Sequence, residues 1–136
     1  MIKAIILCFL ITTVYAGDDK TASAIFNMIT KSITKKSHAT VYLHTQVNAL
    51  EKHPGNLQII KDCKKADLLI VSTMDKIPKE CQQKIIFGTR YSHLKNSNVV
   101  GAFFWQKGRP NILFYEKRLK KKNIKLAPSF EKYIEK

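Results

Sequence analysis

The sequence predicts a small, single-domain, layered α/β fold with a central mixed sheet, a C-terminal hairpin and flanking helices. Residues 66–72 form a continuous apolar run, which is typical of a strand covered on both faces. Apolar side chains in residues 21–33 recur every three or four positions, as on one face of a helix. Residues 99–106 and 111–115 flank a Lys-Gly-Arg-Pro turn at 107–110, which indicates an antiparallel hairpin.

The other elements follow from shorter patterns. Residues 39–45 are β-branched and alternating, so we expect a strand with Val41 and Leu43 on one face. Residues 57–65, after a turn at 53–56, fit either a short strand or a helix. Further short elements are predicted as a helical turn at 77–81, a buried strand at 84–87, a helical turn or two at 116–123, and a helical start at Pro128 whose Phe130, Tyr133 and Ile134 dock on the core.

The first sixteen residues have the pattern of a secretory signal peptide. Lys3 gives a positive start, residues 4–14 are apolar apart from two threonines, and residues 14–16 suit a signal peptidase. A membrane anchor needs about 20 apolar residues, and the polar residues 17–20 end the run too early. We therefore expect cleavage after Ala16, one domain over residues 17–136, and a periplasmic or secreted location.

The charge of the chain is strongly positive. It carries 24 Lys and Arg against 10 Asp and Glu, a formal charge of +14, which falls to +13 when Lys3 leaves with the signal peptide. Six of these charges lie within residues 117–125. Nucleic acid is a poor partner for an exported protein, which leaves anionic lipid, polyanions or an acidic protein surface. A solvated helix face explains the same run.

Three cysteines limit the disulfide chemistry. Cys8 leaves with the signal peptide, so Cys63 and Cys81 remain in the exported chain. Both a disulfide, worth about 3 kcal/mol, and two buried free thiols are compatible with the sequence.

Sequence signatures of catalysis and of cofactor or metal binding are absent. The chain has no glycine-rich phosphate loop and no HExxH, GxSxG or CxxC motif. His38, His44, His53 and His93 occur singly, at spacings that match no metal template. The sequence therefore predicts a protein that is not an enzyme and that carries no cofactor or metal.

A loop after the buried strand at 84–87 is a candidate ligand site. Arg90, Ser92 and His93 lie there, and loops at strand ends are where α/β domains bind ligands. Arg90 offers a planar guanidinium for a carboxylate or phosphate, and hydroxyls and backbone amides near Gly88 support an anion. The alternative is an ordinary loop in which Arg90 pairs with a surface acid and Tyr91 packs on the core.

Three consecutive aromatic residues predict a second functional surface. Phe103, Phe104 and Trp105 lie in one strand, so their rings must point to both faces of the sheet. One face is then covered by a helix or exposed for a partner. We expect Phe103, Phe104, Trp105 and Arg109 to form a partner-binding face, because exposed aromatic rings and arginines commonly dominate binding energy.

The sequence resembles the YfiR-like family of periplasmic regulators. The resemblance lies in the signal peptide, the helix at 24–33 leading into 39–43, the strand at 66–72, and the ending formed by 111–114, 118–120 and 124–128. The hairpin at 105–110 matches no motif of that family. The resemblance implies a domain similar to one lobe of a periplasmic binding protein that docks on the sensor domain of a membrane diguanylate cyclase and restrains it.

The expected function is therefore that of an exported, non-enzymatic regulatory protein that binds a membrane signalling partner. The partner would be the periplasmic domain of a diguanylate cyclase or a histidine kinase, and an anionic lipid surface is a further candidate. The alternative is a periplasmic domain of the substrate-binding-protein type that binds a small anion at Arg90, Ser92 and His93.

Overall fold

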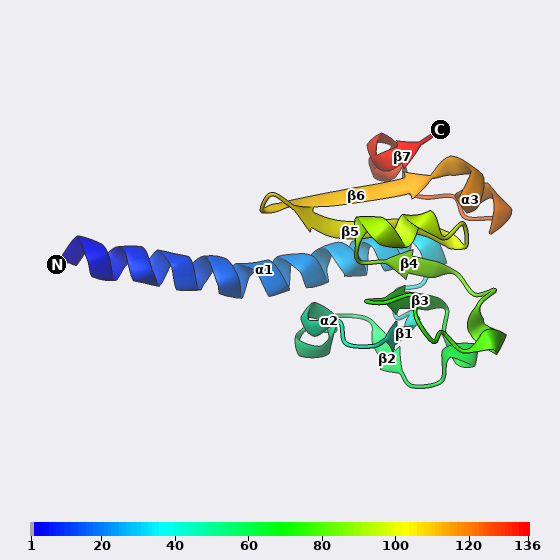
Figure 1. Ribbon diagram of the computed structural model, residues 1–136, viewed down its shortest axis with the longest axis horizontal. Helices are drawn as coiled ribbons and strands as arrows, with labels where there is room; N and C mark the ends of the chain where they lie inside the picture. Colours follow the sequence, from blue (N-terminus) through cyan, green and yellow to red (C-terminus); the bar gives the residue numbers. More distant parts are fainter. Residues whose placement is uncertain (1) are drawn as a thin grey trace.

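The computed structural model describes residues 2–136, with side chains described from Asp18 onward (Figure 1). It contains a seven-stranded sheet in the order β2-β1-β3-β4-β5-β6-β7. The strands are β1 Thr40–His44, β2 Gln58–Ile60, β3 Leu68–Val71, β4 Ile86–Gly88, β5 Val99–Gln106, β6 Arg109–Tyr115 and β7 Ile134–Glu135. Strands β1 to β5 run parallel to their neighbours, β6 returns antiparallel to β5, and β7 is parallel to β6. The predicted small α/β fold with a mixed sheet and a hairpin is confirmed.

The described residues form one long helix and several short helical segments. The α-helices are α1 Ile2–Thr34, α2 Asn48–Lys52 and α3 Glu116–Lys121, and the 3-10 turns are η1 Cys63–Lys65, η2 Lys79–Cys81, η3 Tyr91–Lys95 and η4 Pro128–Tyr133. The signal-peptide prediction concerns residues 1–16, whose side chains lie outside the described part of the chain. Over the residues that are described, no helix has the length and apolar character needed to cross a membrane.

Two apolar layers cover the two faces of the sheet. The layer on one face includes a buried stripe of α1, formed by Ala22, Phe26, Ile29 and Ile33. The layer on the other face is formed by short segments, among them η1, η2 and η3. β3 lies between them, because Leu68 and Ile70 belong to the first layer and Leu69 and Val71 to the second, and each is 0% exposed. The strand predicted to be covered on both faces is therefore confirmed.

A β-bulge decides where the aromatic residues of β5 point. Ile86 pairs with Val99 but Phe87 pairs with Gly101, so β5 has one extra residue opposite β4. A Cβ atom on Gly101 would lie 2.5 Å from the ring of Phe114 in β6, so only glycine fits there. Beyond the bulge, Phe103 packs in the layer of α1 and Phe104 in the other layer.

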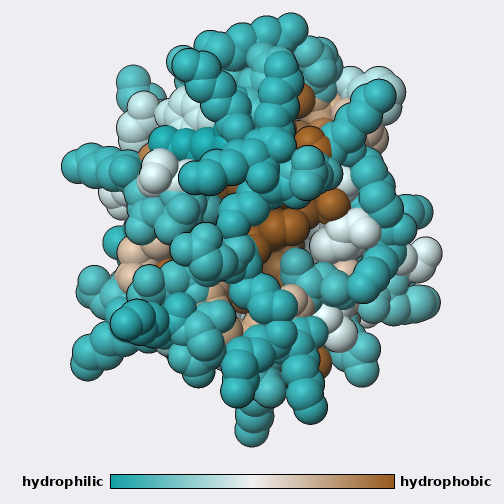
Figure 2. Space-filling view, turned by 90° about the vertical axis from the view of Figure 1, so that its right-hand side faces the viewer, coloured by the Kyte–Doolittle hydropathy of each residue, from teal (hydrophilic) through white to brown (hydrophobic). Residues whose placement is uncertain are grey.

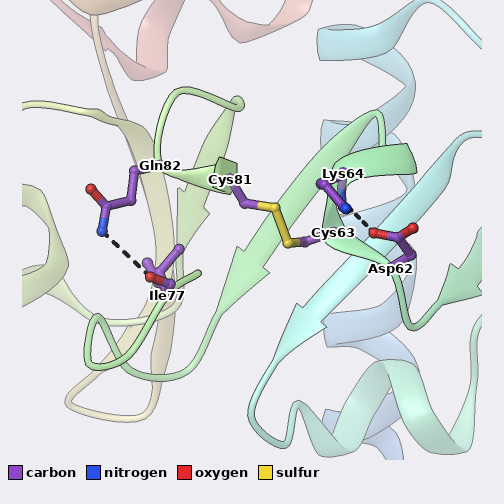
Figure 3. Close-up of a disulfide and its surroundings, with 6 residues drawn as sticks. All are labelled: Asp62, Cys63, Lys64, Ile77, Cys81 and Gln82. Atoms are coloured by element: carbon purple, nitrogen blue, oxygen red, sulfur yellow. Dashed lines mark hydrogen bonds between the residues drawn. A yellow bond between two sulfur atoms is a disulfide. The ribbon is translucent and has the colours of Figure 1, made fainter. Parts of the chain in front are cut away.

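A disulfide joins η1 to η2 (Figure 3). Cys63 and Cys81 are buried, their Cα atoms are 6.1 Å apart, and they are separated by 18 positions in the sequence. η1 leads into β3 and η2 precedes β4, so the bond connects the segments that enter two neighbouring strands. The structure therefore decides between the two alternatives in favour of the disulfide.

Some short elements differ from the prediction. Residues 57–65 contain both a strand, β2, and a 3-10 turn, η1, and the loop after β4 contains η3. Neither α2 nor β7 was predicted, because five and two residues are too few to show a periodicity. β7 is a strand because its two residues pair with β6 in the sheet. The predicted docking of the C-terminal segment is confirmed, since Phe130 is buried and Tyr133 and Ile134 pack against the core.

Candidate functional site

A cleft of about 180 Å³ opens at the carboxyl edge of the parallel strands. Gln46 lies just beyond β1, Ser72 follows β3, and Thr89 follows β4, and all three line the cleft. Parallel strands bring the residues that follow them to one edge, and open α/β sheets bind ligands at this edge. We call this feature the carboxyl-edge cleft.

Aromatic rings from α1 and β5 form the apolar wall of the cleft. The ring centroids of Phe26 and Phe103 are 5.1 Å apart, and those of Phe103 and Trp105 are 5.8 Å apart. Phe26 and Phe103 are 4% and 2% exposed, whereas Trp105 is 43% exposed. Ala22, Val47 and Ala49 complete the apolar lining. Of the three rings, that of Trp105 is therefore the one open to solvent and to a ligand.

Two hydroxyl residues that line the cleft, Ser72 and Thr89, are fixed by hydrogen bonds to backbone carbonyls. Thr89 Oγ1 donates a hydrogen bond of 2.9 Å to the carbonyl of Val71, and Ser72 Oγ donates one of 3.3 Å to the carbonyl of His44. Ser72 Oγ also contacts the hydroxyl of Thr45, whose φ of 61° is unusual for a β-branched residue. A hydroxyl has one proton, so the Thr89 oxygen is left as a hydrogen-bond acceptor.

Two carboxylates line the same cleft. Asp18 and Asp19 come from α1, and Asp19 Oδ2 lies 3.3 Å from Lys52 Nζ of α2. Among the side chains from residue 18 onward, no basic group forms a salt bridge with Asp18. From residue 18 onward, the lining contains no Lys, Arg or His, although the chain has 24 Lys and Arg. The cleft is thus a local acidic region in a strongly basic protein.

The predicted anion loop is arranged differently from the expectation. Arg90 and Ser92 are exposed, but His93 is buried and its Nδ1 accepts hydrogen bonds from the amides of Thr89 and Arg90, at 3.1 and 3.2 Å. Burial, and then the nearby charge of Arg90, lower the pKa of His93. A Cβ atom on Gly88 would lie 2.8 Å from His93 Cβ. His93 therefore fixes the loop at the end of β4. The amides of Thr89 and Arg90 already donate to its Nδ1, so these two donors are not available to a bound anion.

Two of the four residues predicted to form a partner face are buried. Phe103 and Phe104 are 2% and 9% exposed, because α1 covers the first and the Tyr91 ring packs on the second at 5.6 Å. Trp105 and Arg109 are exposed. They belong to the hairpin of β5 and β6, which extends past the ends of β3 and β4 alongside α1 (Figure 1). The expected exposure of Phe103 and Phe104 is therefore wrong, because the layers on the two faces of the sheet cover both rings, and partner binding by Trp105 and Arg109 stays a prediction.

The basic residues at 117–125 have two different roles in the structure. Arg118 Nη1 donates to the carbonyls of Leu94, Asn96 and Val99, at 2.9, 3.2 and 3.0 Å, and its guanidinium lies 4.4 Å from the Tyr115 ring centroid. Arg118 is therefore a structural residue that holds the segment leading into β5. The exposed lysines of the run are Lys117, Lys120, Lys121 and Lys125.

Tertiary packing adds further lysines to this end of the sheet. Lys35 Nζ donates to the carbonyl of Lys125, and the amide of Ala127 donates to Ser32 Oγ at 2.8 Å. These contacts bring the end of α1, with its exposed Lys31, Lys35 and Lys36, beside the segment after α3. Figure 2 looks at the molecule from this side and shows hydrophilic side chains around a central apolar area. We call this region the amino-edge face, because the parallel strands start there.

Comparison with known proteins identifies no relative of the chain. No family model, no curated protein and no solved structure matches it significantly. The resemblance to the YfiR-like family thus stays a prediction from the pattern of elements.

Sequence reasoning placed a candidate ligand site at a strand end, in the loop after β4, and it did not name most of the residues that line the carboxyl-edge cleft. Thr89, directly after Gly88, belongs to that loop, whereas Asp18, Gln46 and Ser72 were not predicted as cleft residues. A signal was available, since Gln46 and Ser72 stand at the ends of two predicted strands. Asp18 gave no such signal, because its place at the cleft depends on how α1 packs across the sheet.

Proposed function

We propose that the chain is an exported, non-enzymatic regulatory protein that binds and modulates a membrane signalling partner, such as a diguanylate cyclase. The signal-peptide pattern, the absence of catalytic sequence motifs and the YfiR-like pattern support this role. The observation that carries it is the placement of Trp105 and Arg109 on a hairpin that extends beyond its neighbouring strands.

The hairpin is well suited to protein contact. β5 and β6 are paired from Gly101 and Phe114 to Gln106 and Arg109, and the inner part of β5 is buried on both faces. Trp105 and Arg109 therefore stand on a fixed support, so binding costs little ordering of the backbone. Tryptophan and arginine are also the residue types most often found to dominate interface energies.

The amino-edge face supports a second part of the same proposal, an orientation of the protein on anionic lipid. Exposed lysines from α1, α3 and the segment after α3 converge there. Each lysine near a membrane surface contributes about 1 kcal/mol of attraction to anionic headgroups. A regulator held in this way faces the bilayer with the amino-edge face and keeps the hairpin free for a membrane-bound partner.

Affinity capture of solubilised inner-membrane proteins with the full chain tests the partner contact. We expect mass spectrometry to identify a diguanylate cyclase or histidine kinase, and the double variant Trp105→Ala, Arg109→Ala to lose it. The matched control is Tyr91→Ala with Arg90→Ala, which also removes an exposed aromatic ring and an arginine, and which should retain the partner. Retention of the partner by the hairpin variant would refute the proposed face.

Vesicle co-sedimentation tests the lipid contact. We expect binding to vesicles of equal parts phosphatidylglycerol and phosphatidylcholine, and little binding to phosphatidylcholine alone. Raising the ionic strength from about 0.1 M to about 1 M should abolish binding, because the Debye length falls from about 10 Å to about 3 Å. Equal binding to both kinds of vesicle would show that the charge of the lipid is not what the protein recognises.

The alternative is a domain that binds a small anion at Arg90, Ser92 and His93. The exposed Arg90 favours it, whereas the engaged Nδ1 atom of His93 and the acidic carboxyl-edge cleft do not. Thermal shift with phosphate, sulfate and small carboxylates tests it, since a specific ligand raises the melting temperature. A shift that Arg90→Gln removes would favour this alternative.

A further inference from the structure

We propose that the carboxyl-edge cleft binds a small aliphatic amine in its protonated, ammonium form. The first argument is electrostatic. Among the residues whose side chains are described, the cleft is lined by Asp18 and Asp19 and by no basic side chain, and the ammonium group of Lys52 meets only Asp19. Four other surface hollows of the molecule each include at least one Lys or Arg. A cation repelled by most of this surface is therefore attracted to the cleft.

The second argument concerns hydrogen bonds. The proton of Thr89 Oγ1 is committed to the carbonyl of Val71, so that oxygen accepts from a ligand. The Asp18 carboxylate has oxygens that only accept, and Gln46 adds a carbonyl oxygen. An ammonium group has donors and no acceptor, and is therefore complementary to these groups. The same cleft already shows such a contact, between Asp19 and the ammonium group of Lys52.

The third argument concerns the aromatic wall. Trp105 is the ring open to the cleft, and tryptophan gives the most favourable aromatic face for a cation. Ala22 and Val47 offer apolar contact for an aliphatic chain. The cleft has a volume of about 180 Å³, which equals the space of about six water molecules, so it suits an amine of only a few carbon atoms.

The experiment is a fluorescence titration of the full chain with n-butylammonium chloride at constant ionic strength. Trp105 is the single tryptophan of the chain, so its emission reports on this cleft alone. Butyrate and butanol have similar size and shape without the positive charge. We expect a saturable change with butylammonium and at least about tenfold weaker responses with butyrate and butanol, from the combined carboxylate and aromatic contacts.

Two variants test whether the carboxylate is responsible. Asp18→Asn should weaken butylammonium binding about fivefold, whereas Glu135→Gln, which removes an exposed carboxylate in β7, should leave it unchanged. Circular dichroism confirms that each variant is folded. Equal responses to butylammonium and butanol, or an unchanged affinity in Asp18→Asn, would overturn the proposal. It goes beyond the partner contact, because binding is measured on this chain alone and can succeed or fail independently of affinity capture.

Discussion

The two edges of the parallel sheet are built in different ways. At the amino edge, the Cys63–Cys81 disulfide joins two segments that enter strands, and Arg118 binds three carbonyls in the segment that enters β5. At the carboxyl edge, the segments that leave β1, β3 and β4 surround a cleft with an exposed tryptophan, an acceptor hydroxyl and two carboxylates. At the amino edge, Arg118 and the disulfide hold the segments together, whereas at the carboxyl edge the corresponding segments line a cleft.

This difference shows that a basic residue in the sequence has no fixed role. Arg118 and Lys121 are three positions apart, yet the first is structural and the second is exposed to solvent. In the same way, Phe103 and Trp105 are two positions apart in β5 and share one face, but α1 covers mainly the first. At each edge, substitutions of two nearby residues, one engaged in the fold and one exposed, therefore separate structural roles from surface roles.

The largest expected effect is at Phe103. Phe103→Ala should lower the free energy of unfolding by about 3–5 kcal/mol, because it leaves a cavity under α1. Trp105→Ala should cost about 1–2 kcal/mol, since 43% of that residue is already exposed. Urea denaturation measures both. Equal losses would mean that Trp105 belongs to the core and is not a surface residue of the carboxyl edge.

The disulfide gives the next effect, at the amino edge. Cys63→Ala together with Cys81→Ala should lower the free energy of unfolding by about 3 kcal/mol, because the unfolded chain loses a constraint on a loop of 18 residues. A reducing agent should destabilise the natural chain by a similar amount and leave the variant unaffected. If the reducing agent changed neither protein, the bond would make no contribution to stability.

Arg118 and Lys121 separate structural from surface charge. Arg118→Lys keeps the charge but loses the Nη1 donor to three carbonyls and the guanidinium over the Tyr115 ring, and should cost about 2 kcal/mol of stability with unchanged vesicle binding. Lys121→Ala should change stability by less than about 0.5 kcal/mol and weaken binding to anionic vesicles. Chemical denaturation and co-sedimentation are the measurements. The opposite pattern would place Arg118 at the lipid surface.

The smallest effect concerns pH and His93. Because burial and Arg90 lower its pKa in the folded state, the unfolded chain binds the proton more tightly. The contribution of His93 is therefore complete above about pH 6.5, the unfolded value, and is lost as the pH falls through the lower folded value. His93→Asn, which keeps an acceptor for the loop amides, should flatten the decline of stability below pH 6.5. An unchanged slope would show that His93 does not cause it.

The fold was predictable because most of its elements carry a local pattern. The apolar run at 66–72, the stripe in residues 21–33 and the Lys-Gly turn between two strands each depend on neighbouring residues alone. The candidate site was predicted only in its general place, at the end of a strand. Its residues come from α1, α2, β5 and three loops, most of them distant in the sequence, and no local pattern joins Asp18 to Thr89.

The sequence by itself determined the class of fold, the positions of the main strands along the chain and the excess of positive charge. The tertiary structure decided that Cys63 and Cys81 form a disulfide and that Arg118 binds backbone carbonyls. It also decided that Phe103 and Phe104 are covered, and that two aspartates line a cleft with an aromatic wall at the carboxyl edge. The physical reason is that periodicity and charge are properties of neighbouring residues. Burial and hydrogen-bond partners depend on segments that meet only when α1 and the short turns close over the two faces of the sheet.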